Sequence, residues 1–279
     1  MNTFIKIDEL KERLKDENIK VIDCRFDLFN PEYGEKAYTE NHIQGAFFLD
    51  VNKDICGEKQ EHGGARPIPH TGVFAGKLEV MGISDSTTIV LYDDNIYGSA
   101  RAFWQMKYMG MEDIHILEGG WNGWVSEGVA CSSEVPKAAS LGKISIKMDE
   151  SIYCDMDYVS HCKNKKGTAI IDGRAHERFT GEYEPLYAKA GHIPSALSFP
   201  CSQNMEAECS LKDKKTLAKL YESLDGLDEI ISYCGSGIAG ARNFVVLREL
   251  GMPVRLYVGS LSDWIGYEEN CIETGEERQ

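Results

Sequence analysis

The chain has 279 residues, of which 42% are hydrophobic and 27% charged, as in soluble globular proteins of one or two domains. Its formal net charge of -15 disfavours nucleic acid and anionic membranes as partners, because both attract basic surfaces. No stretch approaches the roughly 20 apolar residues of a membrane helix. The start of the chain lacks a signal-peptide pattern, so the sequence predicts a cytoplasmic protein.

Cysteine usage argues against a disulfide framework and against a zinc site. The number of cysteines, nine, is odd, and no pair has C-x-x-C spacing. We therefore expect reduced thiols and predict neither a metal nor a cofactor. The cysteines are Cys24, Cys56, Cys131, Cys154, Cys162, Cys201, Cys209, Cys234 and Cys271.

Short apolar runs alternate with longer mixed segments along the chain. In the first half, the predicted strands are 21–22, 89–92 and 114–117. In the second half, they are 169–171, 230–233 and 254–257, and helices are predicted over 211–224 and 241–250. This alternation predicts an α/β fold with parallel sheets flanked by helices on both faces.

The two halves repeat one another. Asp23 and His42 correspond to Asp172 and His192 with shifts of 149 and 150, and Asp93 corresponds to Cys234 with a shift of 141. The shift falls because the first copy has a longer segment between its matching blocks, roughly 51–86, part of which is predicted to be loop. We predict domains over 1–130 and 145–279, joined by a polar, proline-bearing linker over 131–144.

Cys234 follows the predicted strand 230–233 and precedes a glycine-rich loop and a predicted helix. Ligands of parallel sheets bind at this end of the strands. Glycines at 235, 237 and 240 permit the positive φ angles that aim successive N–H groups at one point. Such a loop at a helix N-terminus favours a thiolate or an anion bonded to it.

Two chemistries use a cysteine in such a loop. Phosphate-ester hydrolysis normally needs an arginine six positions after the cysteine, and that position is Gly240 here. Sulfur transfer, in which the cysteine carries a sulfur atom as a persulfide, does not need that arginine. The sequence therefore favours sulfur transfer.

The ordered motifs resemble those of tandem-domain rhodanese-type sulfurtransferases, nearest to the 3-mercaptopyruvate branch. The motifs cover most of the chain and are the runs 172–174, 178–181, 191–194, 234–239 and 258–264. The resemblance implies two rhodanese-like domains, the second catalytic and the first inactive, as Asp93 at the place of the thiol indicates. It also implies a double displacement through a Cys234 persulfide to an acceptor such as cyanide, a thiol or thioredoxin.

The resemblance further implies the residues that bind the sulfur donor. Arg178 matches the arginine that holds the donor's carboxylate or sulfonate, and the loop residues are Gly235, Ser236, Gly237, Ile238, Ala239 and Gly240. A second arginine of the mercaptopyruvate branch is replaced by Tyr187, whose hydroxyl is able to bond a carboxylate. Arg66 is expected to supply the missing cation, with His62 as an alternative.

Other readings of the same residues stay open. Thiosulfate enzymes place basic residues just after the cysteine. In this chain those positions are occupied by Gly235 and Ser236, which favours 3-mercaptopyruvate over thiosulfate as donor. A non-catalytic persulfide carrier or redox sensor would use the same reactive Cys234. The recurring His42 and His192, and the pairs Asp23/Arg25 and Asp172/Arg174, are interpreted as structural.

Overall fold

The computed structural model describes residues 3–207 and 210–276, so Cys209 lies outside the described residues. The chain folds as two units. Unit 1 comprises 1–57, 68–149 and 206–211, and unit 2 comprises 58–67, 150–205 and 212–279. Residues 58–67 of the first copy thus belong to the unit that contains Cys234. The predicted domain limits stay a prediction, and in the structure residues 131–149 belong to unit 1.

Unit 1 is built on a five-stranded parallel sheet with the order β1-β6-β5-β2-β4. All five residues of β5 are buried, which requires cover on both faces of the sheet. The sheet strands are β1 (Phe4–Ile5), β2 (Ile19–Asp23), β4 (Phe47–Phe48), β5 (Thr88–Tyr92) and β6 (Ile114–Leu117), and β3 (His42–Ile43) pairs with β7 (Cys131–Ser132). The helices are α1 (Ile7–Arg13), α2 (Tyr33–Glu40), η1 (Val51–Ile55), α3 (Thr71–Val80), α4 (Gly98–Tyr108) and α5 (Gly120–Ser126).

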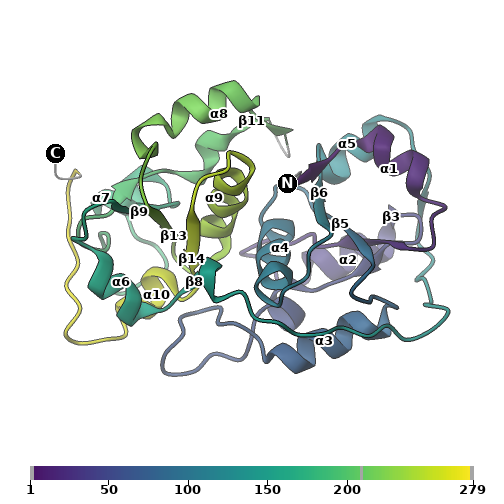
Figure 1. Ribbon diagram of the computed structural model, residues 1–279, viewed down its shortest axis with the longest axis horizontal. Coiled ribbons are helices and arrows are strands. Elements are labelled where there is room, and N and C mark those ends of the chain that lie inside the picture. Colours follow the sequence, from purple (N-terminus) through teal and green to yellow (C-terminus); the bar gives the residue numbers. More distant parts are fainter. Residues whose placement is uncertain (1–2, 208–209, 277–279) are drawn as a thin grey trace. The chain divides into compact units, whose positions relative to one another are not determined.

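Unit 2 repeats this topology, because its sheet has the order β10-β9-β13-β14-β8 and every pair is parallel. The pair of β11 (Met205–Ala207) and β12 (Ser210–Leu211) is separate from this sheet, and its residues 206–211 belong to unit 1. The sheet strands of unit 2 are β8 (Tyr153–Cys154), β9 (Thr168–Asp172), β10 (Leu197–Ser198), β13 (Glu229–Tyr233) and β14 (Val254–Tyr257). The helices are η2 (Glu150–Ile152), α6 (Met156–Cys162), α7 (His176–Thr180), η3 (Cys201–Asn204), α8 (Lys214–Leu220), η4 (Glu222–Leu224), α9 (Ile238–Glu249) and α10 (Ser260–Trp264). Figure 1 shows helices packed against the sheet of each unit.

The six predicted strands are confirmed, and the two predicted helices need correction. The helix predicted over 241–250 begins three residues earlier, at Ile238, because the loop after Cys234 is short. The helix predicted over 211–224 is wrong in part: it consists of the end of β12, α8 and η4. The Asp213 carboxylate accepts from the N–H groups of Lys215 and Thr216, so the α-helix begins only after this cap.

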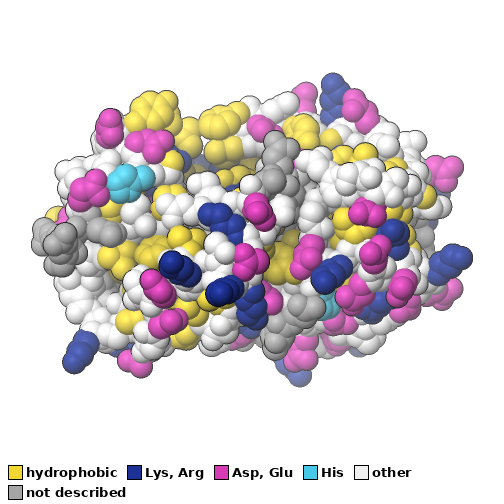
Figure 2. Space-filling view, turned by 90° about the horizontal axis from the view of Figure 1, so that it is seen from above, with side chains coloured by type: hydrophobic (Ala, Val, Ile, Leu, Met, Phe, Trp, Pro, Cys, Tyr) yellow, Lys and Arg dark blue, Asp and Glu magenta, His cyan; other side chains and the backbone are white. Residues whose placement is uncertain are grey.

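The surface and the helices agree with the composition. On the face shown in Figure 2, Lys and Arg side chains are interspersed with Asp and Glu. Among the described residues, no helix is both long and apolar enough to cross a membrane.

Candidate active site

Cys234 lies directly after β13, and α9 begins four residues later. The residue is 2% exposed, so its thiol is held inside the loop. Its N–H donates to the Ser260 hydroxyl at 3.1 Å, and the Ser260 Oγ lies 3.9 Å from the Cys234 Sγ. Ser260 lies in the run 258–264, but nothing in the sequence marks it as a partner of Cys234.

The glycines of the loop serve two different purposes. Gly237 has a φ of 79°, as expected for a position that favours glycine. The expectation of positive φ at Gly235 and Gly240 is wrong, because these glycines provide space instead. A Cβ at Gly235 would lie 2.8 Å from the Tyr187 hydroxyl oxygen, and one at Gly240 would lie 3.0 Å from the Tyr233 carbonyl carbon.

Unit 1 shows what this loop conformation binds. At the position equivalent to Cys234, the Asp93 carboxylate accepts from the N–H groups of Asn95, Ile96 and Ser99 at 3.3, 2.7 and 3.0 Å. Ile96 has a φ of 58°, matching Gly237 at the same shift of 141. The loop of unit 1 is thus an anion cradle filled by its own carboxylate. The equivalent N–H groups in unit 2 belong to Ser236, Gly237 and Gly240.

Ser236 connects the cysteine loop to two of the predicted residues. The Arg66 Nη1 donates to the Ser236 Oγ at 3.1 Å, and the Tyr187 hydroxyl lies close enough to the Ser236 side chain to interact with it. Burial and the charge of Cys234 raise the pKa of Tyr187 above its usual value, because both disfavour the phenolate. The structure therefore brings Arg66, Ser236 and Tyr187 together beside Cys234.

Segment 58–67 reaches this site through contacts with helix α10. The Gly63 N–H donates to the Asp263 carboxylate at 2.7 Å, and the Ala65 N–H donates to the Ser262 hydroxyl at 2.9 Å. His62 stacks on Tyr267 with ring centroids 4.3 Å apart. His62 is exposed and helps to hold the segment, whereas Arg66 is the residue that contacts the cysteine loop.

Arg178 is held by a glutamate that the sequence analysis did not consider. Its Nε and Nη2 donate to the Glu184 carboxylate at 2.8 to 3.1 Å, and its guanidinium lies 5.7 Å from the centroid of the Tyr187 ring. The Glu184 side chain is 1% exposed and also accepts from Arg174 at 3.0 Å. The run 182–187 contains two glutamates, Glu182 and Glu184, and nothing in the sequence singles out Glu184 for this role.

The Asp/Arg pairs and His192, which are interpreted as structural, bond to one another or to the backbone. Arg174 pairs with Asp172 at 2.6 Å, and Arg25 pairs with Asp23 at 2.7 Å in the other copy. His192 is 2% exposed, its Nδ1 lies 2.8 Å from the Phe179 carbonyl oxygen, and its ring stacks on Phe179. These groups shape the strand ends and do not face the reactive sulfur.

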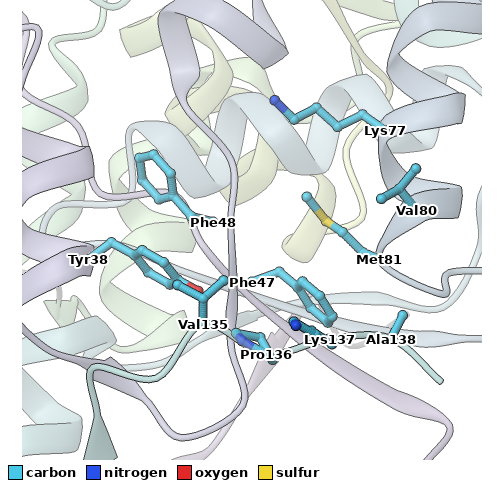
Figure 3. Close-up of a pocket in the computed structure, with 10 residues that line it drawn as sticks. All are labelled: Tyr38, Phe47, Phe48, Lys77, Val80, Met81, Val135, Pro136, Lys137 and Ala138. Carbon is cyan, nitrogen blue, oxygen red and sulfur yellow. The ribbon is translucent and has the colours of Figure 1, made fainter.

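A pocket of about 420 Å³ lies within unit 1, and its lining is mainly apolar (Figure 3). It is lined by Tyr38, Phe47, Phe48, Lys77, Val80, Met81, Val135, Pro136, Lys137 and Ala138. None of the residues around Cys234 takes part in it. In the described part of the chain, no group of three or more His, Cys, Asp or Glu side chains is arranged to hold a metal ion.

Comparison with known proteins finds rhodanese-like domains and relatives that are named as sulfurtransferases. The profile of the family described as "Rhodanese-like domain" matches residues 6–127 and 155–267. A probable 3-mercaptopyruvate sulfurtransferase of Pseudomonas aeruginosa is 33% identical over 98% of both chains. The sulfur carrier protein TtuD of Thermus thermophilus is 32% identical over 98% of this chain and 97% of its own. The crystal structure of the 3-mercaptopyruvate sulfotransferase SseA from Escherichia coli has a TM-score of 0.79 and 26% identity, covering 94% of this chain and all of its own.

Proposed function

Because the chain belongs to the family of proteins with rhodanese-like domains, we propose that it is a sulfurtransferase whose nucleophile is Cys234. It takes a sulfane sulfur from a small donor, with 3-mercaptopyruvate favoured, and passes it to a thiophilic acceptor. Cyanide, a small thiol and thioredoxin are acceptors of the right chemistry. We further propose a cytoplasmic location, where thiols such as Cys234 stay reduced.

The cradle around Asp93 is the observation that carries this proposal. Three N–H groups of that loop bind a negative charge, and the equivalent loop in unit 2 presents a thiol at the same place. The N-terminus of the 12-residue helix α9 follows the thiol, and a helix N-terminus stabilises negative charge such as that on the outer sulfur of a persulfide.

The structure supports Arg66 as the cation that attracts the donor. Its guanidinium is bonded to Ser236, two residues after the nucleophile, and the shape of a guanidinium matches that of a carboxylate. Arg178 was the first candidate for this role, but Nε and Nη2 of its guanidinium bind Glu184. We propose that Arg178 positions Tyr187 and that its remaining amino group contributes to the donor site.

A persulfide carrier is the second candidate function, and the relation to the sulfur carrier protein of Thermus thermophilus favours it. A carrier and an enzyme both need a reactive Cys234, and they differ in whether the protein turns over a small donor. Thiosulfate as the preferred donor of the enzyme is a third possibility that the same experiment tests.

The decisive experiment compares the wild type with Cys234→Ser. Sulfur release from 3-mercaptopyruvate and from thiosulfate is measured in parallel, with cyanide as acceptor. We expect turnover in the wild type, faster with 3-mercaptopyruvate, and a fall to background in Cys234→Ser because serine does not form a persulfide.

Cys271→Ser is the matched control, because Cys271 is an exposed cysteine and its loss should leave turnover unchanged. Turnover that survives in Cys234→Ser contradicts the assigned nucleophile. A wild type that accepts sulfur on Cys234 but shows no turnover with either donor would favour the carrier.

A further inference from the structure

The Tyr187 hydroxyl lies against the cysteine loop. A Cβ at Gly235, the residue after the nucleophile, would lie 2.8 Å from the hydroxyl oxygen, so only glycine leaves room for it. The Tyr187 ring packs against the core cluster of unit 2, which contains Tyr233 and Leu261. The hydroxyl is thereby fixed beside Ser236.

The number of protons on Ser236 and Tyr187 decides whether these two hydroxyls can donate a hydrogen bond to a third group. Arg66 is a donor only, so Ser236 Oγ accepts the bond from its Nη1. The hydroxyls of Ser236 and Tyr187 carry one proton each. Even where one hydroxyl donates to the other, one proton of the pair is left to point at a third group. The positive charge of Arg66 makes that proton a better donor.

The two sulfur donors, 3-mercaptopyruvate and thiosulfate, differ in whether their reaction with Cys234 is assisted by such a proton. When the Cys234 thiolate attacks the sulfur of 3-mercaptopyruvate, a sulfur–sulfur bond forms and the carbon–sulfur bond breaks. The electron pair of the broken bond moves to the carbon and onto the keto oxygen, giving the enolate of pyruvate. The proton of the donor thiol then balances the step by returning to carbon, so that a persulfide anion and pyruvate result.

Thiosulfate transfers the same sulfur without an enolate. The thiolate attacks the outer sulfur, the sulfur–sulfur bond of thiosulfate breaks, and its electron pair leaves with sulfite. No keto oxygen is present and no proton is taken up. A hydroxyl donor placed for an enolate oxygen therefore assists one donor and not the other.

We infer that the Tyr187–Ser236 hydroxyl pair selects α-keto thiol donors by donating a hydrogen bond, through its remaining proton, to the keto oxygen as the enolate forms. This inference rests on the proposed function and assigns Tyr187 a role in specificity. Burial and the charge of Cys234 raise the pKa of Tyr187, so the phenol keeps its proton at neutral pH and stays a donor.

Tyr187→Phe tests the inference, because it removes the hydroxyl and keeps the ring in its packing. We expect kcat/KM for 3-mercaptopyruvate to fall by about 100-fold, the order seen when one such donor is lost. We expect kcat/KM for thiosulfate to change by less than about 3-fold, because no enolate forms with this donor. Tyr183→Phe is the matched control on the same segment, since Tyr183 is exposed, and both rates should stay at wild-type values.

A second measurement bypasses the donor altogether. The wild type and Tyr187→Phe are loaded chemically with polysulfide, and the transfer of sulfur from the persulfide to cyanide is followed. We expect equal rates, because no enolate forms in this half-reaction. This comparison also applies if turnover with thiosulfate is too slow to measure in the wild type.

The outcomes separate this inference from the proposed function. An unchanged kcat/KM for 3-mercaptopyruvate in Tyr187→Phe overturns the inference alone. Equal losses for 3-mercaptopyruvate and for the discharge of the persulfide also overturn it, since they indicate general damage to the loop. A wild type that turns over neither donor overturns the proposed enzyme instead.

Discussion

Arg66 illustrates how a single residue acquires its role from a distant part of the chain. It is 168 positions before Cys234, yet its guanidinium bonds to Ser236 in the cysteine loop. The contact depends on the anchoring of Gly63 and Ala65 to Asp263 and Ser262. The bond to Ser236 holds the Arg66 guanidinium at the cysteine loop.

We predict that Arg66→Ala weakens binding of the anionic donor. The KM for 3-mercaptopyruvate should rise about 10-fold or more, because one charge-assisted hydrogen bond contributes on the order of 1.5–3 kcal/mol. Arg66→Lys should recover part of the loss, since it keeps the charge but not the fork of donors. Steady-state kinetics with both variants measure this, and an unchanged KM in Arg66→Ala contradicts the role.

Segment 181–190 is an element without regular structure that is nevertheless held firmly. Glu184 is buried in its middle and binds both Arg174 and Arg178, and Arg174 binds Asp172 at the end of β9. Tyr187 follows three residues later and lies over the cysteine loop. A buried carboxylate between two guanidinium groups therefore sets the position of the tyrosine.

We predict that Glu184→Gln loosens this segment. Two arginines lose their shared anion, and the free energy of unfolding should fall by about 3 kcal/mol, as for a broken buried ion pair. Urea denaturation measures the loss. The kcat/KM for 3-mercaptopyruvate should fall as well, because Tyr187 is no longer fixed, whereas discharge of a preformed persulfide to cyanide should be retained.

The control for this prediction is Glu182→Gln. Glu182 belongs to the same segment but is exposed, so its replacement should change neither stability nor kinetics. If Glu184→Gln lowers stability but leaves the kinetics with 3-mercaptopyruvate intact, Glu184 has a structural role only.

At the scale of the whole molecule, two copies of one fold use the same loop differently, one for stability and one for the proposed chemistry. Both sheets have the same strand order, and in both copies a tyrosine at the end of the central strand accepts from the N–H of an isoleucine. The cradle of unit 1 is closed by Asp93, and the cradle of unit 2 contains Cys234. The Asp93 carboxylate stabilises its loop permanently. The loop around Cys234 instead stabilises a negative charge that is present only during the reaction, such as that of the proposed persulfide.

We predict that Asp93→Asn destabilises unit 1 and leaves the chemistry at Cys234 unchanged. The amide turns one donor toward the N–H groups that the carboxylate satisfied, so the free energy of unfolding should fall by about 2 kcal/mol. Chemical denaturation measures the change, and sulfur transfer per folded molecule should stay at the wild-type value. Asp27→Asn is the control, because Asp27 also accepts two N–H bonds but is exposed, and water replaces the lost acceptor.

The sequence by itself determined the features that depend on local pattern. Continuous apolar runs predict buried parallel strands, and all six were found, because burial on both faces leaves no polar alternation. The repeat and the thiol at a strand end followed from the order of residues along the chain. The limits of helices were less certain, since a side-chain cap such as Asp213 decides where α8 begins.

Only the tertiary structure decided which side chains meet at Cys234. The partnership of Arg178 with Glu184, the stacking of His62 on Tyr267, and the contact of Arg66 with Ser236 all join residues whose separation in sequence carries no signal of proximity. The role of Gly235 changed for the same reason, because the space it leaves is needed by Tyr187 and not by its own backbone. Chain order fixes the nucleophile, and packing in three dimensions fixes the charges and protons around it.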